Sequence, residues 1–371
     1  MADNPNAFKH WIGPALLETL SRELKRVSPR LETAPLTRLE ARLRPLELKD
    51  RVRLVRDTLY EILPRDYPKA LRILLRASKG DTLKGFALWP VTEFVQTYGL
   101  DDFDRSMDAL HTLTQRFTAE FAVRPFLKRD PERTFAVLER WAADPNHHVR
   151  RCASEGSRPR LPWGERIPAL IEDPQPGLRV LEKLRFDPED YVRRSVANHL
   201  NDISKDHPEI VCATLARWRR DADPAAAVHL EWTVRHALRG LIKSGHPGAL
   251  HLVGAGSSAD IRARHLRLEK SAVAIGDSLD FSVTLVSASA AAQKLVVDYV
   301  IHYLKANGEH GPKVFKLKTF ELPPGGTVRL AKRHSLRLIT TRVYYPGTHR
   351  IGVQVNGAIV AEKRWQLLPG R

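Results

Sequence analysis

Carboxylates and arginines share one helical face in two stretches of this chain, HHVRRCASEGSRPRLPW and VRRSVANHLNDISKDHP. Residues spaced by four and by seven or eight positions lie on the same face of a helix. The two faces then carry Arg151, Glu155 and Arg158 in the first stretch, and Arg194, Asn198 and Asp202 in the second. Arginines in such a row can follow a phosphate backbone. The carboxylates either neutralise the arginines beside them or act on a positively charged group of a ligand, and the spacing leaves both open.

The first of these helices stops in an irregular loop that contains a tryptophan. Gly156, Pro159 and Pro162 interrupt the helical pattern, and a proline disfavours helical geometry in the residue before it. The loop therefore presents Trp163 beside carboxylates and guanidinium groups. Such a combination could hold a nucleotide, with the ring against the sugar or base, arginines on the phosphates, and carboxylates near positive charge on the sugar. The alternative is that Trp163 packs in the protein core.

The elements that must position these residues are short helices between residue 8 and about residue 255. Their apolar residues recur at helical spacing, and prolines mark several helix starts. Three similar stretches are offset by 43 and then 41 residues, within the roughly 40–47 residue period of HEAT and armadillo repeats. We expect an α-solenoid with a ladder of arginines along one side. The predicted ladder consists of Arg151, Arg194 and Arg235. The neighbouring Arg150 and Arg193 are expected to pair with acidic residues of adjacent repeats.

Beyond residue 255 the spacing changes from helical to alternating. The linker HLVGAGSSADIRAR is rich in small residues, and the stretches SLDFSVTLV, LVVDYVIHYL, VFKLKTFEL and HRIGVQVNG then alternate with period two. This spacing predicts a β-sandwich, and YYPGTHRIGVQVNG predicts a late strand that enters an Asn-Gly hairpin turn. The expected fold is mainly α: a HEAT-like repeat α-solenoid over residues 1–255, followed by an immunoglobulin-like β-sandwich over residues 262–371.

The net charge of +17 favours polyanionic partners, nucleic acid first. Residues 262–371 contain 18 Lys+Arg against 7 Asp+Glu, whereas residues 1–261 contain 42 against 36. The C-terminal third is therefore expected to be the strongest electrostatic contact with nucleic acid.

The composition also argues against several other classes of protein. No apolar run reaches the roughly 18 residues of a membrane span, so we expect no membrane partner. Cys152 and Cys212 are too few for a disulfide scaffold or a cysteine zinc cluster, which fits a reducing cytoplasm. The pair His147 and His148 lacks further ligands at zinc spacing, so neither a metal nor a cofactor is expected.

In these segments the chain resembles the AlkC-type DNA alkylation-repair glycosylases, relatives of the AlkD group built on HEAT-like repeats. The resemblance covers essentially the whole helical region, and it lies in LELKDRVRLVRDTLYEILPRDYPKAL, LWPVTEFVQTYGL, FTAEFAVRPFL and the two stretches quoted first. Some members also have a C-terminal immunoglobulin-like domain. The resemblance implies a DNA glycosylase that excises N-alkylated cationic bases, 3-methyladenine and 3-methylcytosine, from duplex DNA in base excision repair. The family hydrolyses the N-glycosidic bond without flipping the base, unlike most glycosylases.

The resemblance also implies roles for individual residues. The implied catalytic set is Asp202, Glu155, Trp163 and Glu120. Asp202 would act as base and electrostatic partner, Glu155 would share the site, and either carboxylate could position the water. Predicted DNA contacts are Arg151, Arg158, Arg194, Asn198, His199, Arg235, Lys332 and Arg333. For Asn198 and His199 a polar cap or a buried hydrogen bond is an equal alternative.

The expected partner is duplex DNA with alkylated bases, bound by a monomer in the bacterial cytoplasm at the nucleoid. Two other functions remain open on the sequence. One is a non-catalytic HEAT-repeat scaffold, because solenoids and immunoglobulin-like domains commonly bind proteins. The other is a DNA-damage-binding protein that has lost catalysis. Release of methylated base from duplex DNA separates both from a glycosylase.

Overall fold

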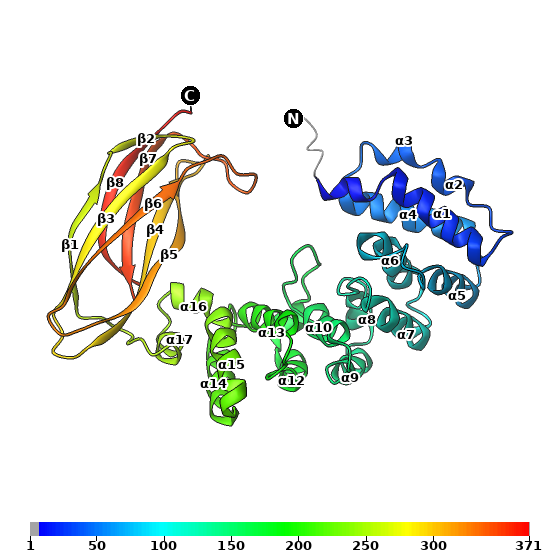
Figure 1. The fold of residues 1–371 in the computed structure, drawn as a ribbon, viewed down its shortest axis with the longest axis horizontal. Helices are drawn as coiled ribbons and strands as arrows, with labels where there is room; N and C mark the ends of the chain where they lie inside the picture. Colours follow the sequence, from blue (N-terminus) through cyan, green and yellow to red (C-terminus); the bar gives the residue numbers. More distant parts are fainter. Residues whose placement is uncertain (1–6, 371) are drawn as a thin grey trace. The chain divides into compact units, whose positions relative to one another are not determined.

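The computed structural model describes residues 7–370, which form two compact units (Figure 1). One unit extends to Asp206 and also includes Pro224–Thr233. The other contains His207–Asp223 and the chain from Val234 onward. No helix in the described part of the chain combines the length and the apolar character that crossing a bilayer requires.

The first unit is a row of short helices, several of which begin with a proline in the first turn, where its missing N–H costs nothing. The helices are η1 (Phe8–Trp11), α1 (Pro14–Val27), α2 (Ala34–Thr37), α3 (Glu40–Leu43), α4 (Leu48–Ile62), α5 (Tyr67–Ala77), η2 (Gly85–Leu88), α6 (Trp89–Tyr98), α7 (Phe103–Thr114), α8 (Arg124–Arg129), α9 (Pro131–Trp141), α10 (His147–Gly156), α11 (Pro168–Glu172), α12 (Gln175–Lys183) and α13 (Asp190–Ile203). Each longer helix buries one apolar stripe against its neighbours.

The predicted repeats are confirmed in α10 and α13, which pack side by side (Figure 1). Val149 and Val192, which occupy equivalent positions in the two helices, are fully buried. The side chain of Asn146 accepts a hydrogen bond from the backbone N–H of His148 and caps the start of α10. Arg150 pairs with Asp187 of the following repeat at 2.6 Å, as the sequence predicts. For Arg193 the same prediction is wrong, because it donates to the backbone carbonyl of Asp187 at 3.0 Å and its ion pair, at 3.8 Å, is with Asp190 of its own helix.

The second unit combines helices with strands. Its helical part contains α14 (Pro208–Asp221), α16 (Arg239–Lys243) and α17 (Pro247–Leu252), while α15 (Pro224–Ala237) is divided between the two units. Helical structure ends with α17, and eight residues, 253–260, separate it from the first strand, which begins at Ile261. Asn356 ties this intervening segment to the strands, because its side chain accepts from the N–H of Val296 at 2.8 Å and donates to the carbonyl of Gly256 at 2.9 Å.

The strands form the predicted β-sandwich. They are β1 (Ile261–Leu268), β2 (Ala272–Ala274), β3 (Ser278–Ser287), β4 (Gln293–Leu304), β5 (His310–Leu322), β6 (Thr327–Ser335), β7 (Gly347–Val355) and β8 (Ala358–Leu368). One sheet has the order β1-β3-β6 and the other β2-β8-β7-β4-β5. Alternate residues of β3 are buried in the core between the sheets, as a period of two requires. The Asn-Gly turn between β7 and β8 is confirmed, with positive φ at both Asn356 and Gly357.

Candidate nucleic-acid interface and active site

The helix α10 ends at Gly156, where the chain passes close to the segment before α8. A Cβ atom at this position would overlap Cγ2 of Val123, so only glycine fits without displacement. The first residue of α8, Arg124, holds the chain beyond this point. Its Nη1 donates to the carbonyls of Gly156 at 2.8 Å and Arg158 at 2.7 Å. The irregular loop predicted after α10 is therefore present, and it projects from the row of helices (Figure 1).

The two carboxylates of the predicted catalytic set meet at one guanidinium group. Arg158 donates from Nη1 to Oε1 of Glu155 at 2.6 Å and from Nε to Oδ2 of Asp202 at 2.8 Å. All three residues are buried, with exposed fractions of 3–6%. The remaining oxygens also have partners: Ser195 donates to Glu155 at 2.6 Å, and Lys205 donates to Asp202 at 3.1 Å. Tertiary packing therefore fixes the positions of both carboxylates.

A second arginine, Arg151, connects Glu120 to Glu155. Arg151 donates from Nη1 to Oε2 of Glu120 and lies 3.5 Å from Oε1 of Glu155. Thr118 also donates to Oε2 of Glu120 at 2.8 Å. The ring of Tyr191 covers the guanidinium of Arg151 at 5.0 Å from the ring centroid. We call Glu120, Arg151, Glu155, Arg158 and Asp202 the carboxylate cluster.

The charges of the carboxylate cluster are strongly coupled. Burial works against the positive charge of Arg158, but Glu155 and Asp202 more than offset it and raise its pKa. Burial, reinforced by the charge of Arg158, lowers the pKa of His199 to about 3, so this ring is neutral. Among the directly paired buried groups, three carboxylates face two guanidinium groups. Lys205, which pairs with Asp202 at 3.1 Å, adds a third cation, so the paired charges of this group balance.

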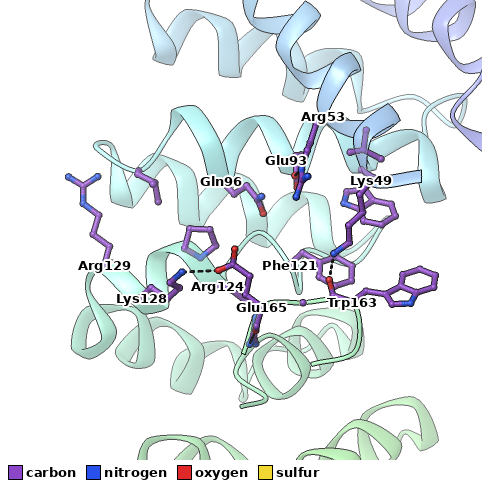
Figure 2. A pocket seen from close by; sticks show the side chains of 15 residues that line it. Lys49, Arg53, Glu93, Gln96, Phe121, Arg124, Lys128, Arg129, Trp163 and Glu165 are labelled. Carbon is purple, nitrogen blue, oxygen red and sulfur yellow. Dashed lines mark hydrogen bonds and ion pairs between the residues drawn. The ribbon is translucent and has the colours of Figure 1, made fainter. Parts of the chain in front are cut away.

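The structure places Trp163 at the surface and not in the core. Its side chain is 56% exposed and lies 6.4 Å from the ring of Phe8, centroid to centroid. Its φ of 64° is in the left-handed region, which a bulky residue rarely adopts. Lys49 of α4 donates to the Trp163 carbonyl, and Figure 2 shows the indole directed away from that contact. The backbone contacts thus hold an exposed aromatic side chain in a strained conformation.

The predicted arginine ladder is only partly at the surface. Of the ladder, Arg194 is exposed and pairs with Asp190 at 2.8 Å, whereas Arg151 lies inside the carboxylate cluster. Arg158 lies in the same cluster, but the prediction that it shares a helical face with Glu155 is wrong, because α10 ends at Gly156. The guanidinium groups of Arg151 and Arg158 neutralise carboxylates, which is one of the two roles left open by the spacing. Asn198 is half-buried. Of the alternatives for His199, the structure shows the buried hydrogen bond: its Nδ1 donates to the carbonyl of Ser154 at 2.9 Å. Its ring fills the space beside Gly177 of α12.

The predicted DNA contacts of the second unit lie on exposed surface. Lys332 and Arg333 are exposed on β6, and Arg333 pairs with Asp280 at 2.7 Å. Arg235 lines a groove of about 580 Å³ between the end of α15 and the strands β4 and β5. The other cations of this groove are Arg239, Lys243, Lys294 and Lys316. The sequence did not single them out because they come from separate elements.

Sequence reasoning also missed a cavity beside the Trp163 loop. It has a volume of about 430 Å³ and lies between α4, α6, α8 and the loop (Figure 2). Its lining includes Lys49, Trp89, Glu93, Gln96, Phe121 and Arg124. Ser195, which holds Glu155, was missed as well. Its position beside Arg194 in the recurring Val-Arg-Arg motif is the signal that could have found it.

The fold and this site together define a HEAT-like repeat protein of the DNA alkylation-repair class. Residues 115–241 match the family described as DNA alkylation repair enzyme, and residues 262–369 match the family described as the C-terminal Ig-like domain of uncharacterised protein YhaZ. The chain is 41% identical over 314 residues to the uncharacterized protein YhaZ of Bacillus subtilis, covering 85% of each chain.

A solved structure extends the likeness to nearly the whole chain. It is the alkylpurine DNA glycosylase AlkC of Pseudomonas fluorescens, bound to DNA containing an abasic site analog. The two chains are 40% identical with a TM-score of 0.91, and the match covers 98% of this chain and 99% of the other. The chain therefore belongs to the AlkC-type DNA alkylation-repair glycosylase family.

Proposed function

We propose that this protein is a DNA glycosylase that removes N-alkylated cationic bases, 3-methyladenine and 3-methylcytosine, from duplex DNA. The observation that carries the proposal is the carboxylate cluster, in which Glu155 and Asp202 are held by one buried guanidinium group at 2.6 and 2.8 Å. The similarity to a DNA-bound alkylpurine glycosylase supports the same reaction class.

The chemistry of the substrate fits an active site made of carboxylates. A base alkylated to a cation is already a good leaving group, so the enzyme need not protonate it. Cleavage of the N-glycosidic bond leaves positive charge on the deoxyribose, as in other glycoside hydrolyses with oxocarbenium-like transition states. Fixed negative charge in a partly dry site stabilises that charge more strongly than water does. The fixed carboxylates of Glu155 and Asp202 would therefore favour bond cleavage over substrate binding.

Each member of the cluster has a separate part in this proposal. Asp202 acts as the base toward water and, with Glu155, stabilises the sugar cation. Glu120 takes both of its hydrogen bonds at Oε2 and supports the site through Arg151. Trp163 lies against the lesion. Its indole is suited to this contact because it is exposed and its backbone is held in a fixed conformation. Because the groups act on the sugar, the base need not be flipped into a pocket.

The DNA backbone is proposed to contact cations outside the cluster. Arg194, Arg235, Lys332 and Arg333 are exposed and could reach phosphates, with Asn198 beside Arg194. Arg151 and Arg158 act as positioning residues for the carboxylates, and His199 as a buried neutral support. We further propose that the protein acts as a monomer in the cytoplasm, at the nucleoid.

The experiment is base release from methylated duplex DNA. Full-length protein is incubated with duplex containing 3-methyladenine or 3-methylcytosine, and free base and abasic sites are measured. Release of methylated base with matching abasic sites is the expected result. A damage-binding protein would retain the duplex without releasing base, and a scaffold would do neither.

A further inference from the structure

The cavity beside the Trp163 loop has polar atoms without hydrogen-bond partners. Oε1 of Gln96 is buried and has no hydrogen-bond partner in the part of the chain that the structure describes. Glu93 lies one helical turn earlier on the same face of α6, and its side chain is 12% exposed. Among the described residues, its carboxylate forms ion pairs with Arg56 at 3.8 Å and Arg53 at 4.0 Å, both beyond hydrogen-bond length. Burial raises the pKa of Glu93 despite these arginines. The cavity is thus lined by one acceptor without a donor, Oε1 of Gln96, and by a carboxylate whose ion pairs are longer than hydrogen bonds.

The cations that line the same cavity are already paired. Lys49 donates to the carbonyl of Trp163, and Lys128 pairs with Glu165 at 2.8 Å (Figure 2). Arg129 pairs with Asp101 at 2.7 Å. A phosphate in this cavity would have to displace these partners and would face two acceptors. A ligand that donates hydrogen bonds would instead satisfy groups that are costly to leave unpaired.

Two aromatic side chains also line the cavity. Trp89 and Phe121 stack with ring centroids 5.4 Å apart and planes inclined by 14°. Nε of Arg124, which lines the same cavity, is a buried donor without a partner among the described residues. The atoms without partners are therefore one acceptor and one donor, and the carboxylate of Glu93 and two aromatic rings line the same cavity. Nucleobases offer the matching edge, since donors and acceptors alternate around a flat ring.

We propose that this cavity binds a free purine base of the kind released by the glycosylase, with its N–H groups donating to Gln96 and Glu93 and its ring against Trp89 and Phe121. The choice of a purine among aromatic N–H compounds rests on the proposed function. A volume of about 430 Å³ lies within the usual range for small-ligand sites. Arg124 also holds the loop that carries Trp163, so the site lies directly beside the proposed lesion contact.

The test is calorimetric titration of full-length protein with 3-methyladenine, repeated in the presence of inorganic phosphate. We expect saturable binding of one base per chain that phosphate does not compete away. Gln96→Leu removes the unpaired buried acceptor, so the variant should fold as well as the parent and bind the base about tenfold or more weakly. Glu93→Gln should also weaken binding. The matched control Glu132→Gln, an exposed glutamate on α9, should bind like the parent.

Three results would overturn the proposal: no detectable binding of the base, unchanged affinity in both cavity variants, or displacement of the base by phosphate. Base release from methylated duplex is measured in parallel. A protein that releases base yet binds none in this cavity refutes only the cavity proposal. A protein that binds the base as predicted yet releases none refutes only the proposed function.

Discussion

Nε of Arg158 lies 2.8 Å from Oδ2 of Asp202, although the two residues are 44 positions apart in the sequence. The same guanidinium group contacts Glu155, so one buried cation sets the distance between two carboxylates. Without it, two like charges would repel each other in a region of low dielectric constant. This contact makes a fixed acidic site compatible with a stable fold, and it leads to the first two predictions.

Asp202→Asn and Glu155→Gln should abolish most activity without weakening DNA binding. Both changes keep the shape of the side chain and remove the charge that stabilises the sugar cation. We expect base release to fall about 10²–10³-fold in single-turnover assays. DNA affinity should stay the same or increase, since a negative charge near a polyanion is lost. If either variant releases base at the parental rate, that residue has no catalytic role.

Arg158→Met should destabilise the protein strongly. The change leaves Glu155 and Asp202 buried without their shared partner, and removing one member of a buried ion pair costs about 3–5 kcal/mol. Thermal or denaturant unfolding measures the loss. Arg160→Met is the matched control, because Arg160 pairs with a partly exposed Asp206 at 2.8 Å and should cost about 1 kcal/mol or less. Equal losses in the two variants would contradict a special role for the buried contact.

Trp163→Gly and Trp163→Ala should separate backbone strain from function. Both remove the exposed indole and should lower base release. Only glycine adopts the left-handed φ of 64° freely, so the glycine variant should be more stable than the alanine variant by about 1 kcal/mol. Differential scanning calorimetry checks this order. An alanine variant of equal or higher stability would show that the backbone relaxes at this position.

His199 should make the protein less stable in acid. Its pKa in the folded protein is lowered to about 3 because burial disfavours the charged ring, whereas the unfolded chain takes up a proton near pH 6.5. Between these values the unfolded state binds more protons, so stability falls as the pH drops from about 6.5 toward 3, by up to about 1.4 kcal/mol per pH unit. His199→Gln should flatten this dependence in unfolding curves.

The His199 experiment needs a control variant, and a second buried histidine also contributes to the sensitivity to acid. His251→Gln changes an exposed histidine and should keep the parental pH dependence. His334 is also buried, between Tyr299 and Tyr303, with its pKa lowered to about 4, so part of the acid sensitivity should survive in His199→Gln. A parental slope in the His199 variant would mean that the ring is protonated in the fold.

Arg235→Ala and Lys332→Ala should each reduce the salt dependence of DNA binding. A direct phosphate contact contributes about 0.9 to the slope of log affinity against log salt concentration. Binding measured between about 50 and 200 mM salt gives that slope. Lys25→Ala makes the same charge change at an exposed position on α1 and should leave the slope unaltered if the effect is local. Identical slopes in all variants would place the phosphate contacts elsewhere.

The sequence by itself determined the features that depend on local periodicity. Spacing of 3.6 identified the helices, an offset near 40 residues identified the repeats, and alternation identified the strands of the sandwich. Gly156 and the prolines after it predicted the end of α10, because backbone restrictions act on neighbouring residues. Helical geometry likewise placed Arg151 and Glu155 on one face of α10, whereas Arg158 lies beyond the end of that helix.

Only the tertiary structure decided which charges are buried and what they contact. Arg151 occupies the position in α10 that the exposed Arg194 occupies in α13, but it lies against Glu120 and Glu155. Arg158, just beyond the end of α10, is buried against Glu155 and Asp202. Burial of His199 and the cavity lined by Glu93 and Gln96 likewise arise from helices distant in sequence. The physical reason is that desolvation depends on every neighbour in space, whereas periodicity along the chain records only which face of an element turns inward.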